Sequence, residues 1–114
     1  MIGSDMIRGY TDIMILALLL NGESYGYEIS KKIRTITEEK YALKETTLYS
    51  AFTRLEKNRF IFSYPGEQTH GKKRTYYQIT PQGQQYYSDK CEEWELTKEV
   101  VDKFIRKVER NGYN

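Results

Sequence analysis

The sequence is poor in the residues that build disulfides and metal sites. It has one cysteine, Cys91, which cannot form a disulfide within the chain, so nothing calls for an oxidising compartment. It also has one histidine, His70, which lies in a predicted loop with no Cys or His partner nearby. These two scarcities argue against a zinc site and against histidine-dependent catalysis.

Long hydrophobic runs are also absent. The longest, residues 13–20, has eight residues and is too short to span a bilayer. A secretory signal over residues 1–22 is a weak alternative, because Asp5 and Asp12 interrupt it and residues 21–23 offer no small-residue cleavage site. We therefore expect a cytoplasmic protein with no membrane partner.

The net charge of +2 is too small to indicate a nucleic-acid partner, but its distribution is uneven. Residues 44–79 hold seven Lys or Arg against three Glu, a net charge of +4. The segments 1–43 and 80–114 each have a net charge of −1. Positive charge is thus concentrated in the middle of the chain, as a nucleic-acid footprint requires.

Residues 44–57 carry the pattern of an amphipathic helix. Leu48, Phe52 and Leu55 fall at i, i+4 and i+7 and form one apolar stripe. The opposite face carries hydroxyl groups and cations: Thr46, Thr47, Ser50, Thr53, Arg54 and Lys57. Short hydroxyl side chains let a helix approach base edges, and cations neutralise phosphates, so the pattern predicts a DNA-recognition helix. A surface helix with a solvated polar face is the alternative.

Two helices are expected before this one. The first runs from an Asp5 cap to about residue 20, and it is apolar almost all round, which predicts contact with a core and with a second subunit. The second runs over residues 25–35 behind a Ser24 cap, with Ile29, Ile33 and Ile36 as its core face. A polar connection over residues 37–43 then leads to the recognition helix, which is a helix-turn-helix arrangement.

A β-hairpin is expected after the recognition helix. Residues 60–64 and 75–79 are rich in aromatic and β-branched residues, and a glycine-bearing loop separates them. The loop ends in a basic stem of Lys72, Lys73 and Arg74. Such a hairpin forms a wing whose cations contact phosphates, unless they serve only to keep the hairpin soluble.

The last helix is expected to start at a Thr80 cap with Pro81 at its first position and to run to about residue 110. It carries residues at alternating spacings of four and three: Tyr87, Cys91, Trp94, Lys98, Val101, Ile105 and Val108. This coiled-coil-like seam predicts a homodimer, to which Ile13 of the first helix would contribute. The alternative is that the helix folds back along its own domain.

These elements predict a mainly α fold of the α+β type, a winged helix-turn-helix with a two-stranded wing. Residues 1–80 would form the DNA-binding domain, and residues 81–114 the dimerisation helix and tail, in one compact unit. No nucleophile–histidine pair, carboxylate cluster or phosphate-binding glycine loop indicates an enzyme or a cofactor. A winged-helix protein-interaction module is the remaining alternative. The cations of residues 44–79 argue against it, because a pure protein interface would tend to lose them.

Three stretches make the chain resemble the PadR family of bacterial transcriptional regulators, in its short subfamily with one C-terminal helix. Residues 24–29, Ser-Tyr-Gly-Tyr-Glu-Ile, are similar to the signature of the family's second helix. Residues 47–56 are similar to its recognition helix, with Leu-Tyr and Arg-Leu-Glu in place. Residues 74–83 are similar to the wing exit, with the pair Tyr76-Tyr77 followed by Thr80 and Gly83.

The resemblance implies a homodimeric repressor of palindromic operator DNA. It implies that Tyr49 contacts the DNA backbone, and that of the paired tyrosines one is in the core and one near DNA. The DNA-binding residues expected from the pattern and the resemblance together are Lys44, Thr46, Thr47, Tyr49, Ser50, Arg54, Lys57, His70, Lys72, Lys73, Arg74 and Tyr76.

One position departs from the family pattern. Arg59 stands where the family usually has glycine after the recognition helix. Glycine accepts a left-handed conformation there, whereas Arg59 would cost about 1 kcal/mol unless Asn58 takes that conformation instead.

The resemblance also implies release from DNA by a small molecule, such as an aromatic (phenolic) acid or a planar cationic drug. Trp94 would lie opposite its mate across the dimer axis, so that two indoles stack on a flat ligand, with Lys98, Tyr10 and Met6 nearby. The alternative is that Trp94 only packs the seam. A redox switch at Cys91 is a further possibility beside inert packing.

Overall fold

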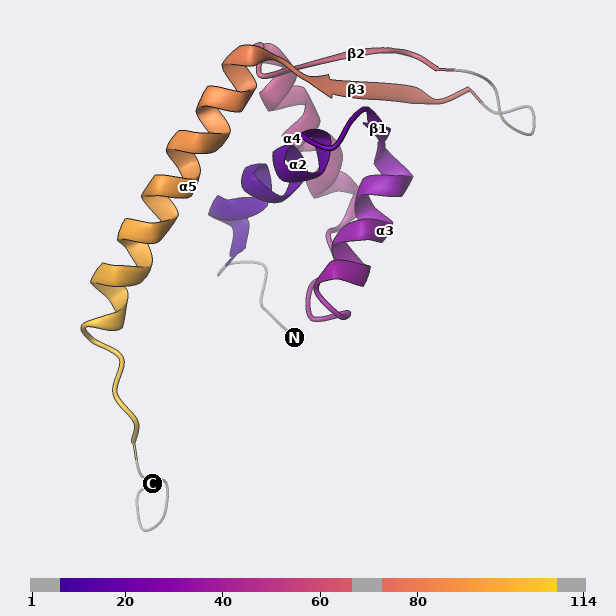
Figure 1. Ribbon diagram of the computed structural model, residues 1–114. Helices are drawn as coiled ribbons and strands as arrows, with labels where there is room; N and C mark the ends of the chain where they lie inside the picture. The colour runs from indigo at the N-terminus through magenta and orange to yellow at the C-terminus, as the bar shows by residue number, and fades with distance from the viewer. Residues whose placement is uncertain (1–6, 67–72, 109–114) are drawn as a thin grey trace.

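The computed structural model describes residues 7–66 and 73–108, and it has the predicted winged helix-turn-helix architecture (Figure 1). In chain order the elements are η1, a 3-10 helix (Arg8–Tyr10), α2 (Thr11–Leu19), β1 (Ser24–Tyr25), α3 (Gly26–Ile36), α4 (Glu45–Lys57), β2 (Ile61–Pro65), β3 (Thr75–Ile79) and α5 (Pro81–Asp102). The predicted recognition helix is α4, and the predicted dimerisation helix is α5.

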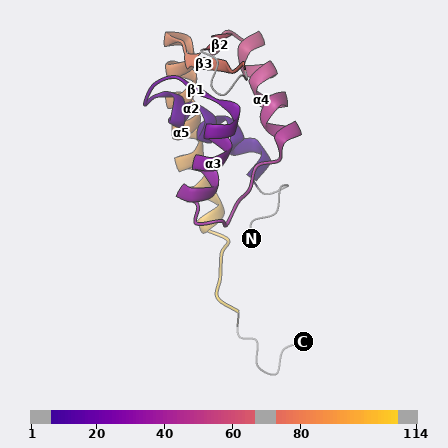
Figure 2. The ribbon, with the colours of Figure 1, turned by 90° about the vertical axis from the view of Figure 1, so that its right-hand side faces the viewer.

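Helix α2 is the central element of the molecule. It packs against α3 and α4 on one side and against α5 on the other (Figure 1). The sheet covers one end of this helical group, and α5 descends from the sheet along the side away from α3. A view turned by 90° shows α4 and α5 at opposite sides with α3 between them in projection (Figure 2). Helices α4 and α5 are therefore joined chiefly through α2 and the sheet.

The core gathers the predicted apolar faces around α2. Ile15, Leu16 and Leu19 of α2 are buried, and so are Ile29 and Ile33 of α3. The stripe predicted on α4 is confirmed, because Leu48, Phe52 and Leu55 are at most 2% exposed. The remaining buried apolar residues are Tyr41, Leu43, Ala51, Ile61 and Tyr77.

The sheet has three antiparallel strands in the order β1-β3-β2, so the prediction of a two-stranded sheet was incomplete. The residue predicted as a helix cap, Ser24, belongs to β1 and pairs with Tyr77 of β3. The Ser24 hydroxyl does not cap α3; it donates to Glu28 at 2.5 Å. Extended Tyr25 occupies the cap position without a side-chain cap, and α3 begins at Gly26. The pairing with β3 thus decided the structure of a residue that local sequence assigned to a helix end.

Three helix predictions need correction. The first α-helix begins at Thr11, behind η1, while the predicted cap Asp5 lies outside the described residues. Ile36 is 67% exposed and is not part of the core face of α3. Helix α5 ends at Asp102 and not near residue 110; residues 103–108 beyond it are all exposed, so no buried contact supports a longer helix. Within the described ranges no helix is both long and apolar enough to span a membrane.

The turn after α4 resolves the question raised by Arg59. Arg59 has a φ of 64° while Asn58 keeps a φ of −86°, so Arg59 takes the left-handed position. Its N–H donates to the Glu56 carbonyl, and the Phe60 N–H donates to the Leu55 carbonyl, which is the Schellman pattern. This left-handed conformation costs about 1 kcal/mol for a non-glycine residue, and it ends α4 and leads into β2.

Candidate nucleic-acid interface

Helix α4 presents the face that the sequence predicted for DNA. Lys44, Thr46, Ser50, Thr53 and Lys57 are exposed, and Thr47 is half-buried. The Thr53 hydroxyl donates to the Tyr49 carbonyl at 3.0 Å, so it has acceptor capacity left for an outside donor. The apolar stripe of α4 faces the core, so these residues are left on the outer side of the helix.

Tyr49 leans from α4 across the start of α3. Its hydroxyl is so close to Gly26 that a Cβ added there would lie 2.4 Å from the hydroxyl oxygen. Its ring meets Phe52 edge-on at 5.5 Å, and 45% of the residue remains exposed. Gly26 therefore matters because it lets the phenol approach the N-terminal end of α3, where unpaired N–H groups favour an anion.

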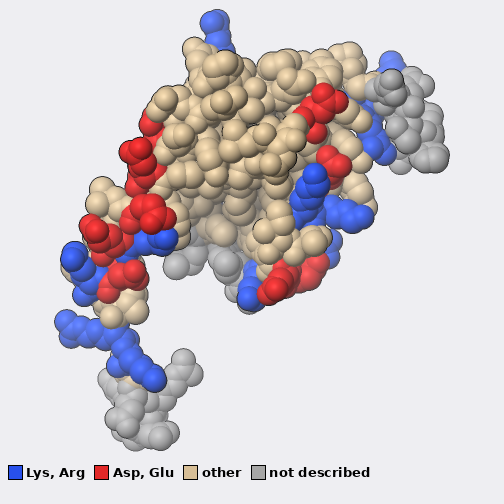
Figure 3. Space-filling view, viewed as in Figure 1, with Lys and Arg blue, Asp and Glu red and all other residues tan. Residues whose placement is uncertain are grey.

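An open cavity of about 490 Å³ lies between the start of α3, the middle of α4 and the stem of the wing. Its lining combines aromatic rings, a helix start and two cations: Tyr25, Gly26, Tyr27, Tyr49, Lys73, Arg74, Thr75 and Tyr77. The Arg74 guanidinium lies 4.2 Å from the centre of the Tyr25 ring, which holds it in place. In the space-filling view, basic side chains gather at this stem, beside the part of the loop drawn in grey (Figure 3).

The paired tyrosines of β3 point to opposite sides of the sheet. Tyr77 is 7% exposed and stacks on Phe52 at 4.0 Å, so it is the core member of the pair. Burial raises the pKa of Tyr77. Tyr76 lies on the outer face and stacks on Tyr25 at 5.6 Å. It is half-buried and belongs to the same aromatic group that holds Arg74.

Arg54 has a partner that the sequence did not reveal. Its guanidinium donates to the carboxylate of Asp12, a nearly buried residue of α2, and the Tyr86 hydroxyl of α5 donates to the same carboxylate at 2.9 Å. Burial, followed by this hydrogen bond, raises the pKa of Tyr86 to about 12, so the phenol stays protonated at neutral pH. The expected phosphate contact of Arg54 competes with this ion pair, and we leave Arg54 out of the DNA-binding set proposed below.

Some predicted residues lie outside the described ranges, and some important ones were not predicted. His70, Lys72 and Met6 fall on residues that the structure does not describe. Asp12 and Tyr86 were missed as partners, although a lone carboxylate beside an apolar run is a usable signal for a buried ion pair. In the described part of the chain, no group of three or more His, Cys, Asp or Glu is placed to hold a metal ion.

A second, apolar groove lies between α2 and the outer half of α5. It has a volume of about 600 Å³ and is lined by Ile7, Tyr10, Ile13, Met14, Trp94, Thr97, Lys98, Val101, Asp102 and Ile105. The Tyr10 ring meets Trp94 at 4.7 Å in an edge-on arrangement. The Lys98 ammonium lies 5.7 Å from the centre of the Trp94 ring. Of the residues predicted for a ligand site, the structure thus brings together Trp94, Lys98 and Tyr10.

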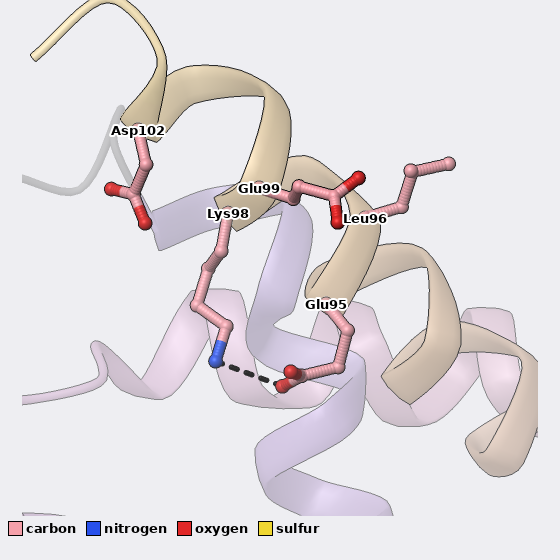
Figure 4. Close-up of a pocket in the computed structure, with 5 residues that line it drawn as sticks. All are labelled: Glu95, Leu96, Lys98, Glu99 and Asp102. Atoms are coloured by element: carbon pink, nitrogen blue, oxygen red, sulfur yellow. Dashed lines mark ion pairs between the residues drawn. The ribbon is translucent and has the colours of Figure 1, made fainter.

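A second hollow on α5 shares Lys98 and Asp102 with this groove, but its lining is mostly charged: Glu95, Leu96, Lys98, Glu99 and Asp102. Lys98 forms a 2.8 Å ion pair with Glu95, and Leu96 points away from this pair (Figure 4). With no aromatic ring in its lining, this hollow offers nothing on which a flat aromatic molecule would stack, so the groove beside Trp94 is the better ligand candidate.

The predicted seam follows α5 only as far as Val101. Tyr87 and Cys91 are half-buried, and hydrogen bonding to Cys91 raises the pKa of Tyr87. Trp94 and Val101 are 37% and 50% exposed. Ile105 and Val108 lie beyond the end of the helix, so the prediction that they continue the helical seam is wrong for this structure, although Ile105 still lines the groove.

Comparisons with known proteins identify a family and several similar chains. The model of the family described as "Transcriptional regulator PadR-like family" matches residues 15–89. An uncharacterised protein of Lysinibacillus sphaericus is 45% identical over 109 residues, which cover 96% of this chain and all of the relative.

Two solved structures are similar in sequence and in fold. A transcriptional regulator from Clostridium thermocellum is 65% identical with a TM-score of 0.85, over 90% of this chain and all of the other. A PadR family transcription regulator from Clostridium difficile is 39% identical with a TM-score of 0.71, over 84% of this chain and 98% of the other.

Proposed function

Because the chain belongs to the PadR-like family of transcriptional regulators, we propose that it is a homodimeric repressor of a palindromic operator, released by a flat aromatic ligand. Membership in this family makes it a transcription regulator and not an enzyme. Its place of action in this proposal is the cytoplasm, where bacterial DNA lies.

The arrangement of α4 and the wing carries the DNA-binding part of the proposal. The hydroxyl-bearing face of α4 is exposed, and Lys73 and Arg74 stand beside the start of α3 around one open cavity. Side chains of this kind suit a major groove, while the cations and the helix start suit phosphates. The proposed contacts within the described residues are Lys44, Thr46, Thr47, Tyr49, Ser50, Lys57, Lys73, Arg74 and Tyr76.

Neutralising the stem of the wing tests DNA binding directly. In the double variant Lys73→Gln/Arg74→Gln, affinity should fall for every duplex, because phosphate contacts carry no sequence information. The slope of log affinity against log salt should become shallower by about 0.9 for each phosphate that is no longer neutralised, or about 3.6 for the two protomers. Fluorescence anisotropy with a labelled duplex at several salt concentrations measures both quantities.

The matched control removes the same two charge types elsewhere. Lys103 and Arg106 are exposed beyond α5, away from the wing, so Lys103→Gln/Arg106→Gln lowers the net charge equally. This variant should keep the slope of the unmodified protein. Equal effects of both variants would mean that net charge alone drives binding, and no DNA binding by the unmodified protein would favour the protein-interaction alternative.

The apolar face shared by α2 and α5 supports the homodimer. Trp94 and Val101, which line the same groove, are 37% and 50% exposed, which is costly in water unless another surface covers them. A two-fold dimer brings the same face of each protomer together and covers both at once. The two α4 helices would then be held at a set distance, as a palindromic site requires.

The groove beside Trp94 supports the ligand. It is mostly apolar, contains two aromatic rings, and has a cation and an acid at its border, Lys98 and Asp102. Flat aromatic molecules stack on such rings, and the border charges would select the sign of the ligand. Ligand-independent DNA binding is the alternative, in which Trp94 only packs the dimer.

Trp94 fluorescence tests the ligand, because Trp94 is the only tryptophan. We expect saturable quenching by a hydroxylated benzoic acid or by a planar quaternary ammonium dye, with weaker binding to DNA in its presence. Lys98→Gln should lower the affinity for the acid by about threefold and leave the affinity for the dye unchanged. Asp102→Asn should lower the affinity for the dye instead. Both effects are small because exposed ion pairs contribute little. Unchanged fluorescence with both probes, in a protein that binds DNA, would favour ligand-independent binding.

A further inference from the structure

The Asp12 carboxylate connects three helices through its two oxygens. Oδ1 accepts from the Arg54 guanidinium of α4, and Oδ2 accepts from the Tyr86 hydroxyl of α5 at 2.9 Å. Asp12 itself, on α2, is 8% exposed. The partners lie 42 and 74 residues away in the sequence, so this contact exists only in the assembled fold.

Hydrogen bonds fix what apolar packing leaves adjustable. Apart from Thr11 and Asp12, the buried residues of α2 are apolar, and apolar contacts have no preferred direction. A charge-assisted hydrogen bond at a nearly buried carboxylate is directional and strong, so it resists a movement that would break it. Stacking on Phe60 at 4.1 Å already anchors the Tyr86 ring, which leaves its hydroxyl to set the rotation of α5 against α2.

We propose that Asp12 is a positioning residue for DNA recognition, which holds α4 and α5 at a fixed mutual geometry through Arg54 and Tyr86. This inference rests on the proposed function: in a dimer joined through α5, the geometry between α4 and α5 sets the distance and the angle between the two recognition helices. The Asp12 cluster thereby determines which half-site spacing the dimer accepts.

The spacing can be measured on DNA that the protein itself selects. Duplexes bound by the unmodified protein from a random library define a palindrome, from which sites with one base pair added or removed at the centre are made. One base pair changes the half-site distance by about 3.4 Å and the angle by about 35°. The unmodified protein should bind the altered sites about tenfold more weakly than the selected site, since the DNA must be deformed to fit.

Tyr86→Phe removes only the hydroxyl and keeps the ring stacked on Phe60. This variant should bind the selected site within about threefold of the unmodified protein and should discriminate against the altered spacings by only about threefold. Asp12→Asn is the second variant and should relax spacing in the same way. Tyr64→Phe is the matched control: it also removes a phenol hydroxyl that donates to a carboxylate, that of Glu23 at 2.6 Å, but it lies in the sheet and not on α5, and it should keep full discrimination.

The outcomes separate this inference from the function on which it rests. Relaxed spacing in Tyr86→Phe or Asp12→Asn, with discrimination kept in Tyr64→Phe, supports the positioning role, whereas lower stability alone would weaken all sites equally. Full discrimination in both variants overturns the role of Asp12 while leaving the repressor intact. Equal relaxation in Tyr64→Phe also overturns it. If the unmodified protein selects no palindrome, the proposed function fails, and the inference fails with it.

Discussion

Replacing Gly83 by alanine should lower the free energy of unfolding by about 3 kcal/mol, although alanine is the better helix former. Gly83 lies in the first turn of α5, and a Cβ there would be 2.0 Å from the Phe60 carbonyl oxygen and 2.8 Å from Ile79 Cγ1. The first of these atoms is backbone and cannot move aside alone. The advantage of about 1 kcal/mol in helix propensity is therefore outweighed by the displacement of α5.

The displacement would break a set of bonds that joins α5 to the turn after α4. The Thr80 N–H donates to the Phe60 carbonyl at 3.0 Å, and the Thr80 hydroxyl donates to the Arg59 carbonyl at 2.7 Å. The same hydroxyl caps α5 by accepting from the Gly83 N–H at 2.9 Å. The first two bonds need the close approach of α5 to this turn that only glycine allows at position 83.

Thermal unfolding followed by circular dichroism at one protein concentration measures the effect. Gly83→Ala should lower Tm by about 10–15 °C in a chain of this size. Gly9→Ala is the matched control, since a Cβ at Gly9 would meet no atom within 4 Å, and it should change Tm by at most about 2 °C. An unchanged Tm in Gly83→Ala would show that α5 sits further from Phe60 than in this structure.

Elements whose signals are local could be predicted from the sequence. The apolar stripe of α4 places Leu48, Phe52 and Leu55 in the core, and Thr80-Pro81 starts α5 with the expected side-chain cap. For the turn after α4, the departure from the family pattern left either Arg59 or Asn58 as the left-handed residue, and the structure assigns it to Arg59. In the first two cases the residue type and its near neighbours carry the information.

Elements decided by distant partners could not be predicted in this way. Ser24 is a good helix cap by residue type, and only its pairing with Tyr77 makes it a strand residue. Arg54 has the spacing of a DNA contact, and only the fold shows that Asp12 takes its guanidinium. Periodicity likewise continued the seam to Val108, whereas the helix ends at Asp102 and the described residues beyond it are exposed. The DNA-facing residues of the candidate site could thus be predicted from local sequence, whereas the contacts that hold them in place are made by residues distant in the sequence.

The second large effect concerns the dimer. Val101→Asp should convert the protein to a monomer and weaken operator binding by about 10²- to 10⁴-fold, because the second half-site then no longer binds within one complex. Val101 is 50% exposed in the single chain, so an aspartate there remains solvated in the monomer and leaves the fold intact. In a dimer joined along this face the same carboxylate would be buried without a partner, which strongly disfavours association.

Light scattering coupled to size-exclusion chromatography gives the mass, and anisotropy gives the affinity for the selected palindrome and for a single half-site. Val101→Thr is the matched control, since it keeps the shape of the side chain without a charge and should remain dimeric. For Val101→Asp the two affinities should become nearly equal, which separates loss of the dimer from loss of the recognition surface. A dimeric mass for Val101→Asp would place the interface on another face of the chain. The exposed side chains beside the groove would then be explained by a ligand alone.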